Sequence, residues 1–243
     1  PYRVPPPELL PERAPGVLAV LYLIFNEGYA ATAGDLVRTE LCDEAIRLAR
    51  VVVPLMPEDA EVRGLLALML LHHSRREART GASGELVLLE DQDRSTWDHE
   101  AIDEGLALLD HAIALGAPGA YQLQAAIAAL HARAPRPEDT DWPQIAALYG
   151  RLMALAPSPV VALNHAVAIA MADGPGVALP LVDALASELD GYHLLHATRA
   201  DLLRRLGDEA GAADAYRRAA ESTSNASERA YLERRIGELI RDP

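Results

Sequence analysis

The stretch ADLLRRLGDEAGAADAYRRA, residues 200–219, predicts two helices joined by a tight turn. Ala200, Ala212 and Ala219 are small residues, which let one helix approach its partner closely. Tyr216 supplies an aromatic side chain to fill the space beside them, and Gly207 stands where the chain must turn. These five positions together predict an antiparallel helix pair.

The same pattern recurs upstream with a regular period. A small residue, a turn glycine and a bulky position repeat in register, as Ala166 and Ala200, Gly174 and Gly207, and Tyr149, Val182 and Tyr216. A spacing of about 34 residues is the signature of the tetratricopeptide (TPR) repeat. An earlier unit fits at Ala45, Ala49 and Pro57, and Ala67 opens the next. Several positions in register favour a repeat over chance matches in an Ala-rich chain.

Helical periodicity covers most of the chain, with short connections that carry Gly, Pro or Asp. The sequence predicts helices over 16–29, 36–53, 60–79, 98–115, 121–132, 143–156, 160–172, 177–189, 192–206, 209–222 and 227–241. We therefore expect an all-α fold over residues 16–243, a TPR-like array of antiparallel helix pairs in an alpha-alpha superhelix. An insertion at 80–97 breaks the period. The helix at 16–29 is apolar nearly all round, which predicts burial between neighbours, with Gly28 as its C-terminal cap.

Composition excludes several classes of function. Hydrophobic residues make up 50% of the 243 residues but aromatic residues only 5%, so the core must be built from Leu, Ala and Val. The net charge of −14 repels phosphate backbones, so we expect no direct nucleic-acid binding by this chain. The lone Cys42 excludes an internal disulfide framework and a cysteine-based zinc site, which fits a reducing cytoplasm. No segment reaches the roughly 18 apolar residues of a membrane span, and no signal-peptide pattern is present.

The first fifteen residues, PYRVPPPELLPERAP, hold six of the seventeen prolines. Proline lacks an amide donor and blocks helix interiors, so residues 1–15 are predicted to be an extended linker. Because the chain opens on Pro1 and not on Met, we expect it to be a piece of a longer protein.

Three segments carry a resemblance to a known family: YLIFNEGY at residues 22–29, the following helix LCDEAIRLARVVVPLMP, and LLEDQDRSTWD at Leu88–Asp98. Together they resemble the C-terminal extension of a group of bacterial extracytoplasmic-function (ECF) RNA polymerase sigma factors. The opening PYRVPP resembles the link that follows the sigma regions. The resemblance covers essentially the whole chain; YLIFNEGY and EDQDRSTWD are its specific motifs.

The resemblance implies a TPR-like regulatory domain that acts in transcription initiation. Its implied partners are its own sigma regions, the RNA polymerase core, or both, and it would stand in for a separate anti-sigma factor. The chain departs from the full-length pattern because it has no basic recognition helix and no sigma-type polymerase-binding stretch. It therefore cannot read a promoter by itself.

Polar residues at the end of YLIFNEGY raise the question of what they bind. Asn26 and Glu27, buried or half-buried beside Tyr29, would need partners, because an unpaired buried polar group costs roughly 1–3 kcal/mol. Arg94 is the obvious cation for Glu27, since an Arg–carboxylate pair is geometrically specific. We expect a Glu27–Arg94 bridge with Trp97 packed over it.

For the acidic residues and histidines, ordinary structural roles are favoured over catalysis or metal binding. Glu27, Glu90, Asp91 and Asp93 resemble a carboxylate cluster, but no nucleophile motif and no Gly-rich phosphate loop accompanies them, and solvated or capping roles are favoured. His193 and His196 can share a helix face, yet no third ligand follows at a recognisable spacing. We expect no enzyme activity, no metal and no cofactor.

A binding groove is the more plausible site. In a TPR array the first helix of each pair lines a concave groove, and the positions two residues before the small first-helix residue are Gln124, Asn164 and Thr198. Their side chains can bond a peptide backbone or a docked helix, or they can be tolerated on a solvated face. Arg204 and Arg205 can hold an acidic partner or be ordinary solvated charges. The alternatives to the sigma-factor domain are a generic TPR scaffold for an unrelated protein or peptide and, more distantly, a helical enzyme.

Overall fold

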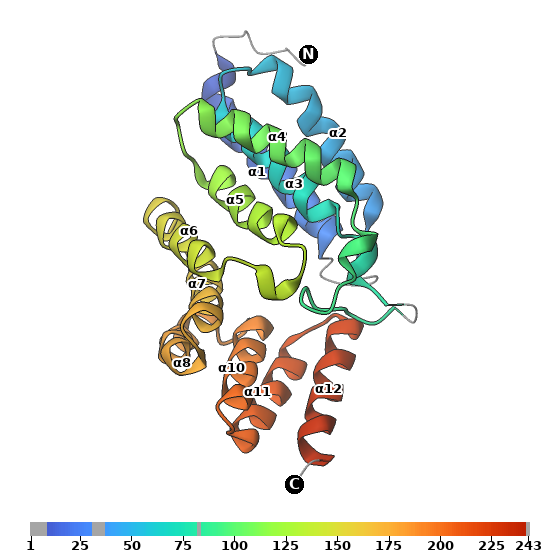
Figure 1. The fold of residues 1–243 in the computed structure, drawn as a ribbon, viewed down its shortest axis with the longest axis vertical. Helices are drawn as coiled ribbons and strands as arrows, with labels where there is room; N and C mark the ends of the chain where they lie inside the picture. Colours follow the sequence, from blue (N-terminus) through green and yellow to red (C-terminus); the bar gives the residue numbers. More distant parts are fainter. Residues whose placement is uncertain (1–8, 31–36, 82–83, 242–243) are drawn as a thin grey trace, which may run out of the picture. The chain divides into compact units, whose positions relative to one another are not determined.

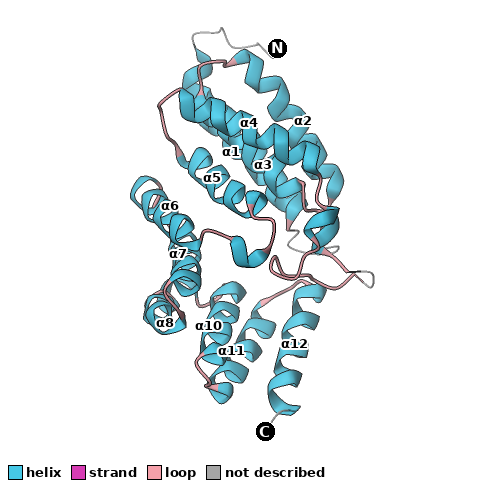
Figure 2. Ribbon diagram, viewed as in Figure 1, coloured by secondary structure: helices cyan, strands magenta, loops and turns pink. Residues whose placement is uncertain are grey.

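The computed structural model describes residues 9–30, 37–81 and 84–241, and the regular structure in these ranges is helical (Figures 1 and 2). Thr80 and Leu86 form one isolated antiparallel bridge. The chain divides into two compact units, each described here by itself. The first holds the described parts of residues 1–31, 37–78 and 93–133, and the second those of 79–92 and 134–243. The expected all-α array of helix pairs is confirmed.

The described part of unit 1 contains five α-helices, four of which pack around the central α3. They are α1 (Leu10–Tyr29), α2 (Thr39–Leu55), α3 (Ala60–His73), α4 (His99–Ala114) and α5 (Ala120–Arg133), with a 3₁₀ turn at Arg94–Thr96 before α4. Helix α3 contacts all four others, and eleven of its fourteen residues are buried. A helix that is apolar all round needs neighbours on every side, and α3 is the helix that has them.

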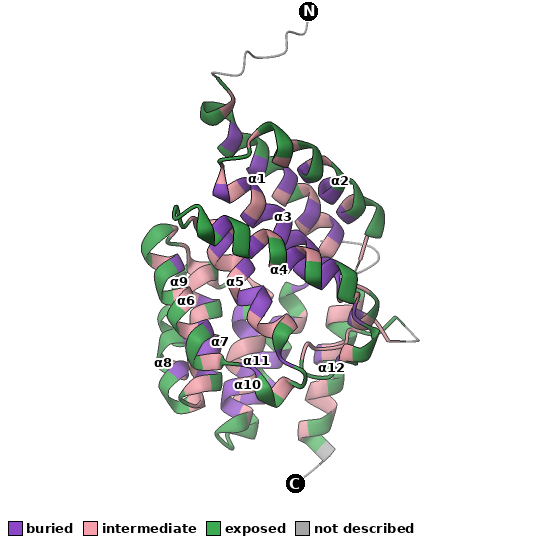
Figure 3. Cartoon of the chain, turned by 45° about the horizontal axis from the view of Figure 1, so that its top comes forward, coloured by how far each residue is buried: buried purple, intermediate pink, exposed green. Residues whose placement is uncertain are grey.

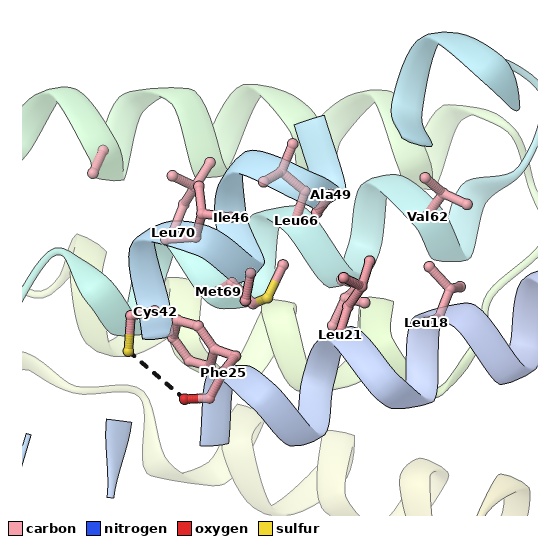
Figure 4. Close-up of a cluster of buried hydrophobic side chains, with 13 residues drawn as sticks. Leu18, Leu21, Phe25, Cys42, Ile46, Ala49, Val62, Leu66, Met69 and Leu70 are labelled. Atoms are coloured by element: carbon pink, nitrogen blue, oxygen red, sulfur yellow. Dashed lines mark hydrogen bonds between the residues drawn. The ribbon is translucent and has the colours of Figure 1, made fainter. Parts of the chain in front are cut away.

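The core of unit 1 lies between α1, α2 and α3 (Figure 4). Phe25 is fully buried at its centre, with Leu21 and Leu18 one and two turns earlier on α1. Met69 and Leu66 from α3 and Ile46 and Ala49 from α2 close around them. The predicted Leu-, Ala- and Val-rich core is therefore present, with a single Phe as its largest member.

The expectation that α1 is buried on all sides is wrong. Val17, Val20 and Leu23 are 45%, 56% and 67% exposed, and exposed and buried stretches alternate along α1 in Figure 3. Helix α1 stands at the edge of unit 1, where α2 and α3 cover only one of its faces. Hydrophobicity all round a helix shows what the helix can bury, and the number of neighbours decides how much it does bury.

Unit 2 contains the repeats predicted from residues 200–219. Its helices are α6 (Trp142–Leu155), α7 (Pro159–Ala172), α8 (Pro175–Ala184), the short α9 (Ala186–Leu189), α10 (His193–Arg205), α11 (Glu209–Ser222) and α12 (Ala226–Arg241). The small positions Ala166, Ala200, Ala212 and Ala219 are buried, as are Val182 and Tyr216. Gly174 and Gly207 both have positive φ, 101° and 84°, so both repeats turn through a backbone conformation that favours glycine.

Three predicted boundaries need correction. The helix α1 begins at Leu10, so residues 10–15 are not extended linker, and residues 1–8 lie outside the described residues. Pro11 sits in the first turn, where no intrahelical N–H bond is lost, and the burial of Ala14 and Leu18 holds the helix together past Pro15. Helix α3 ends at His73 and not at residue 79. Directly after this end, the Ser74 hydroxyl donates to the Leu71 carbonyl. The helix predicted over 177–189 is interrupted at Leu185.

Candidate functional site

The motif YLIFNEGY ends α1 at the point where α1 meets α2. A methyl group at Gly28 would lie 2.8 Å from Cys42 N and Sγ and 2.9 Å from Arg38 O. Gly28 lies inside the helix and is not among the described glycines with positive φ, so the expected C-cap role is wrong. Glycine is required here because the first turn of α2 passes directly against it, and the Arg38 N–H donates to the Gly28 carbonyl at 2.7 Å.

The expected Glu27–Arg94 bridge is wrong in its partner. Glu27 accepts from Arg38 Nη1 at 3.2 Å, so its ion pair joins α1 to the start of α2. Arg94 instead donates from Nη1 to the His131 carbonyl at 2.6 Å. Asn26 lies one turn after Tyr22 on the same helix, where its side chain partly offsets the rise that burial causes in the pKa of Tyr22. The polar residues of the motif therefore fasten α1 locally, and sequence spacing could not choose between two arginines.

Arg94 and Trp97 belong to a cluster of arginine and aromatic side chains on four segments of unit 1. The Arg94 guanidinium lies 4.8 Å from the centre of the Trp97 ring, as expected for a packed pair. Tyr29 stacks on Phe25 at 5.8 Å, faces the His72 ring at 5.1 Å, and lies 5.5 Å from the Arg75 guanidinium. We call Tyr29, His72, Arg75, Arg94, Trp97 and His131 the arginine–aromatic cluster.

A small pocket opens within this cluster. Its cavity volume is about 20 Å³, room for about one water molecule, and its walls are Leu71, His72, Arg75, Trp97, Ala128, His131 and Ala132. Trp97 is only 5% exposed, and its indole Nε1 is buried without a hydrogen-bond acceptor among the described residues. Burial, together with the nearby charges of Arg75 and Arg94, lowers the pKa of His131 to about 4.

The motif EDQDRSTWD acts largely through capping. Asp93 accepts from the Ser95 N–H at 2.9 Å and from its hydroxyl at 2.6 Å, which lowers the pKa of that carboxyl. Asp98 caps α4 by accepting from the Ala101 N–H, and this bond and the neighbouring Arg76 lower its pKa. Of the supposed carboxylate cluster, Asp93 has the expected capping role, whereas Glu27 forms an ion pair with Arg38.

The two histidines of α10 point at different partners. His193 lies 3.1 Å from the Glu228 carboxylate on α12, and His196 bonds the Asp190 carbonyl at 2.6 Å. Within residues 9–30, 37–81 and 84–241, no three His, Cys, Asp or Glu side chains gather closely enough to hold a metal ion.

The residues predicted to line a groove are distributed over both units. Gln124 lies in unit 1, where it accepts from the Tyr22 hydroxyl at 3.0 Å and donates to the Ala120 carbonyl, so its amide is already used inside the fold. In unit 2, Asn164 on α7 is exposed and Thr198 on α10 is half-buried. That Asn164 and Thr198 line a binding groove stays a prediction.

The arginines predicted to hold an acidic partner have partners within unit 2. Arg204 donates to Asp201 at 2.7 Å, and Arg205 donates to the Ala170 carbonyl at 3.0 Å and contacts Met171 Sδ. Arg205 therefore ties α10 to the end of α7. The structure assigns it a packing role, which sequence reasoning left open.

Sequence reasoning missed one half-buried network, centred on Glu61 near the start of α3. Its carboxylate accepts from the backbone N–H groups of Tyr121 and Gln122 at 2.9 and 3.1 Å, and from the Gln122 side-chain amide at 3.2 Å. It thereby caps the N-terminus of α5, where the helix dipole favours negative charge. Residue spacing gives no signal for a contact between segments so far apart in the sequence.

Replacing this cap should destabilise unit 1. We expect Glu61→Ala to lower the free energy of unfolding by about 2 kcal/mol, because it leaves donors at the start of α5 without their acceptor. Urea unfolding followed by far-UV circular dichroism measures the change. Glu58→Ala is the matched control, since Glu58 is exposed one turn before and should change stability by no more than about 0.5 kcal/mol. Equal effects of the two variants would contradict the capping role.

None of the helices in the described part of the chain is long and apolar enough to cross a membrane. The fold defines the class of protein as an all-helical array of packed helix pairs. Residues 13–113 match a family described as a family of unknown function (DUF6596).

The chain is also 50% identical over 233 residues to an uncharacterized protein of Rhizobium meliloti (strain 1021). The match covers 96% of this chain and 55% of that relative, so the chain spans little more than half the relative's length.

Proposed function

We propose that this chain is the regulatory, protein-interaction domain of an ECF sigma factor, a non-catalytic domain that acts in the cytoplasm in transcription initiation. In this proposal DNA and core-polymerase binding belong to sigma regions outside this chain, and the domain contacts those regions or the polymerase. Two features support it: the resemblance carried by YLIFNEGY and EDQDRSTWD, and a relative that is nearly twice as long.

The observation that carries the proposal is the open apolar face of α1. Val17, Val20 and Leu23 follow each other at intervals of three, so they share one side of the helix, and all are largely exposed. Complete burial of a Val or Leu side chain contributes roughly 1.5–3 kcal/mol. Three such residues in a row supply enough free energy to hold a partner surface, while scattered single apolar residues do not.

The sigma regions are the occupant that best fits this face. Residues 14–25, APGVLAVLYLIF, carry no charge, so the face suits an apolar surface and gives no electrostatic attraction to nucleic acid. The longer relative shows that a chain of this kind can be joined to a further polypeptide of comparable size. A partner in the same polypeptide is present at high effective concentration, so a small apolar face suffices to bind it.

The test is titration calorimetry of this chain with the sigma regions of the same protein. We expect binding, and we expect Val20→Glu to weaken it by at least about tenfold, which is about 1.4 kcal/mol. Val177→Glu is the matched control, because Val177 is a valine of nearly equal exposure, 55% against 56%, on α8 of unit 2. Circular dichroism verifies that both variants keep their helical content.

Three results separate the possibilities. Weakening by Val20→Glu alone supports docking on α1, whereas equal affinities for all three proteins would contradict it. Complete absence of binding would contradict contact with the sigma regions and favour the generic scaffold. Asn164, exposed on α7 one repeat before Thr198, is the observation that favours this second function, and Asn164→Ala should then weaken capture of a peptide partner.

A further inference from the structure

We propose that the insertion between α3 and α4 forms a strap that closes over the start of α12, and that opening of this strap exposes an apolar segment of the chain. The strap consists of residues 79–81 and 84–92, the described part of the insertion, and it belongs to unit 2 together with α12. The inference goes beyond the proposed function and does not depend on it.

The strap has a fixed structure of its own. Thr80 and Leu86 form an antiparallel bridge, and the Val87 N–H donates to the Arg79 carbonyl at 2.9 Å. Gln92 is only 6% exposed and donates from Nε2 to the Val87 carbonyl at 3.2 Å, and Arg79 is 8% exposed. Arg and Gln side chains are mostly exposed in folded proteins, and long loops without helix or strand are often functional. A buried polar side chain therefore holds each end of the strap.

The strap interacts with the start of α12, beside which it lies in Figure 1. Three of its residues each act on one residue in the first two turns of this helix: Gly84 on Ser227, Arg79 on Glu228 and Glu90 on Tyr231. The first interaction is a hydrogen bond of 3.2 Å from the Ser227 hydroxyl to the Gly84 carbonyl, and the other two are effects of charge. Among the helices of the described chain, α12 packs extensively on α11 alone, which leaves a side of α12 for the strap.

Glu228 is the centre of this contact. Its side chain is 22% exposed, accepts from the Thr223 hydroxyl at 2.6 Å and lies 3.1 Å from His193 Nε2. Burial raises the pKa of Glu228, but His193, the Thr223 hydroxyl and the charge of Arg79 outweigh this effect and hold the pKa below its usual value. The carboxylate is therefore charged at neutral pH and attracts Arg79 of the strap. Partly buried charges of this kind are screened little by salt.

The closed strap shields an apolar segment. Residues 86–89, LVLL, are four consecutive apolar residues, and each of them is half-buried. Exposed acidic residues flank this run, with Glu85 before it and Glu90 and Asp91 after it. Charges in such flanking positions oppose association of an apolar run that becomes exposed. Opening of the strap would make residues 86–89 accessible to another chain as an extended segment, so the closed strap acts as an internal block on that contact.

Hydrogen exchange followed by mass spectrometry at neutral pH tests the proposal on the intact chain. We expect Glu228→Gln to accelerate exchange both at residues 84–92 and in α12 by at least about tenfold, because a hydrogen-bonded charge is lost. Glu233→Gln is the matched control, since Glu233 is exposed on the same helix and should leave both segments unchanged. Peptides from α3 in unit 1 serve as the internal reference.

The reciprocal variant changes the strap and leaves α12 intact. Arg79→Gln should also accelerate exchange in α12, and the double variant with Glu228→Gln should show less than the product of the two single effects. Faster exchange in α12 with unchanged exchange at residues 84–92 would mean that Glu228 stabilises only the helix start, which would overturn the proposal. Single effects that multiply, or a Glu228→Gln protein that exchanges like the wild type, would overturn it as well. Because no sigma region is present in this experiment, its result is independent of the calorimetric test.

Discussion

Gly28→Ala is expected to lower the free energy of unfolding by about 3 kcal/mol, at the upper end of what overpacking a core costs. The added methyl would lie 2.8 to 2.9 Å from Cys42 N, Cys42 Sγ and Arg38 O. Two of these atoms belong to the backbone of the start of α2, so no side-chain rotation relieves the contact. The helices α1 and α2 must move apart around Phe25, which is fully buried between them.

Gly16→Ala in the same helix is the matched control. A methyl at Gly16 meets nothing within 4 Å, so this variant should be more stable by about 0.5–1 kcal/mol, since alanine favours helix over glycine. Urea unfolding by circular dichroism compares both with the wild type. A Gly28→Ala protein as stable as Gly16→Ala would show that the α1–α2 contact does not require glycine.

The second large effect is a loss of stability in acid that depends on His131. Its pKa is about 4 in the folded state against 6.5 for an unperturbed histidine, because burial and the charges of Arg75 and Arg94 disfavour the imidazolium. The unfolded chain therefore binds a proton more readily than the folded chain. The stabilisation is complete above about pH 6.5 and falls by about 2 kcal/mol at pH 5 and about 3 kcal/mol at pH 4.

The measurement is the free energy of unfolding at pH 7 and pH 5 for the wild type and for His131→Asn. Many other groups titrate in this range, so the informative quantity is the difference between the two proteins. The wild type should lose about 2 kcal/mol more than His131→Asn on acidification. His111→Asn, on the exposed surface of α4, should behave as the wild type. Parallel losses in the wild type and His131→Asn would contradict a buried neutral histidine.

Local sequence signals were strong enough to predict most of the fold. Ala166, Ala200 and Tyr216 fit the repeat period and are buried as the repeat requires. Helix positions followed from apolar spacing and turn residues, and α11 has the predicted bounds, Glu209–Ser222. The predicted linker was wrong over residues 10–15, because the prolines were considered without the burial that holds this part of α1 in a helix. The break at Leu185 was also not predicted, because no strong local signal marks it.

The candidate site was predictable only in part. The packing of Arg94 on Trp97 was expected correctly, because the two lie close in sequence. The partners of Glu27 and Arg94 were not predicted correctly. Any of several arginines could reach the Glu27 carboxylate, and every residue has a backbone carbonyl, so the sequence does not indicate which carbonyl Arg94 binds. The role of Glu61 as a cap for α5 was missed for the same reason.

The sequence by itself determined an all-helical chain, its repeat period and its apolar core, because these depend on residue spacing along one helix. Only the tertiary structure decided which apolar helix is enclosed. Helix α3 is surrounded and α1 keeps Val17, Val20 and Leu23 in contact with solvent, although both are rich in apolar residues. It also decided that Gly28 serves a close helix approach and that Trp97, Arg75 and His131 share one pocket. The physical reason is that burial and charge proximity depend on which segments meet in space, and short-range periodicity does not encode that choice.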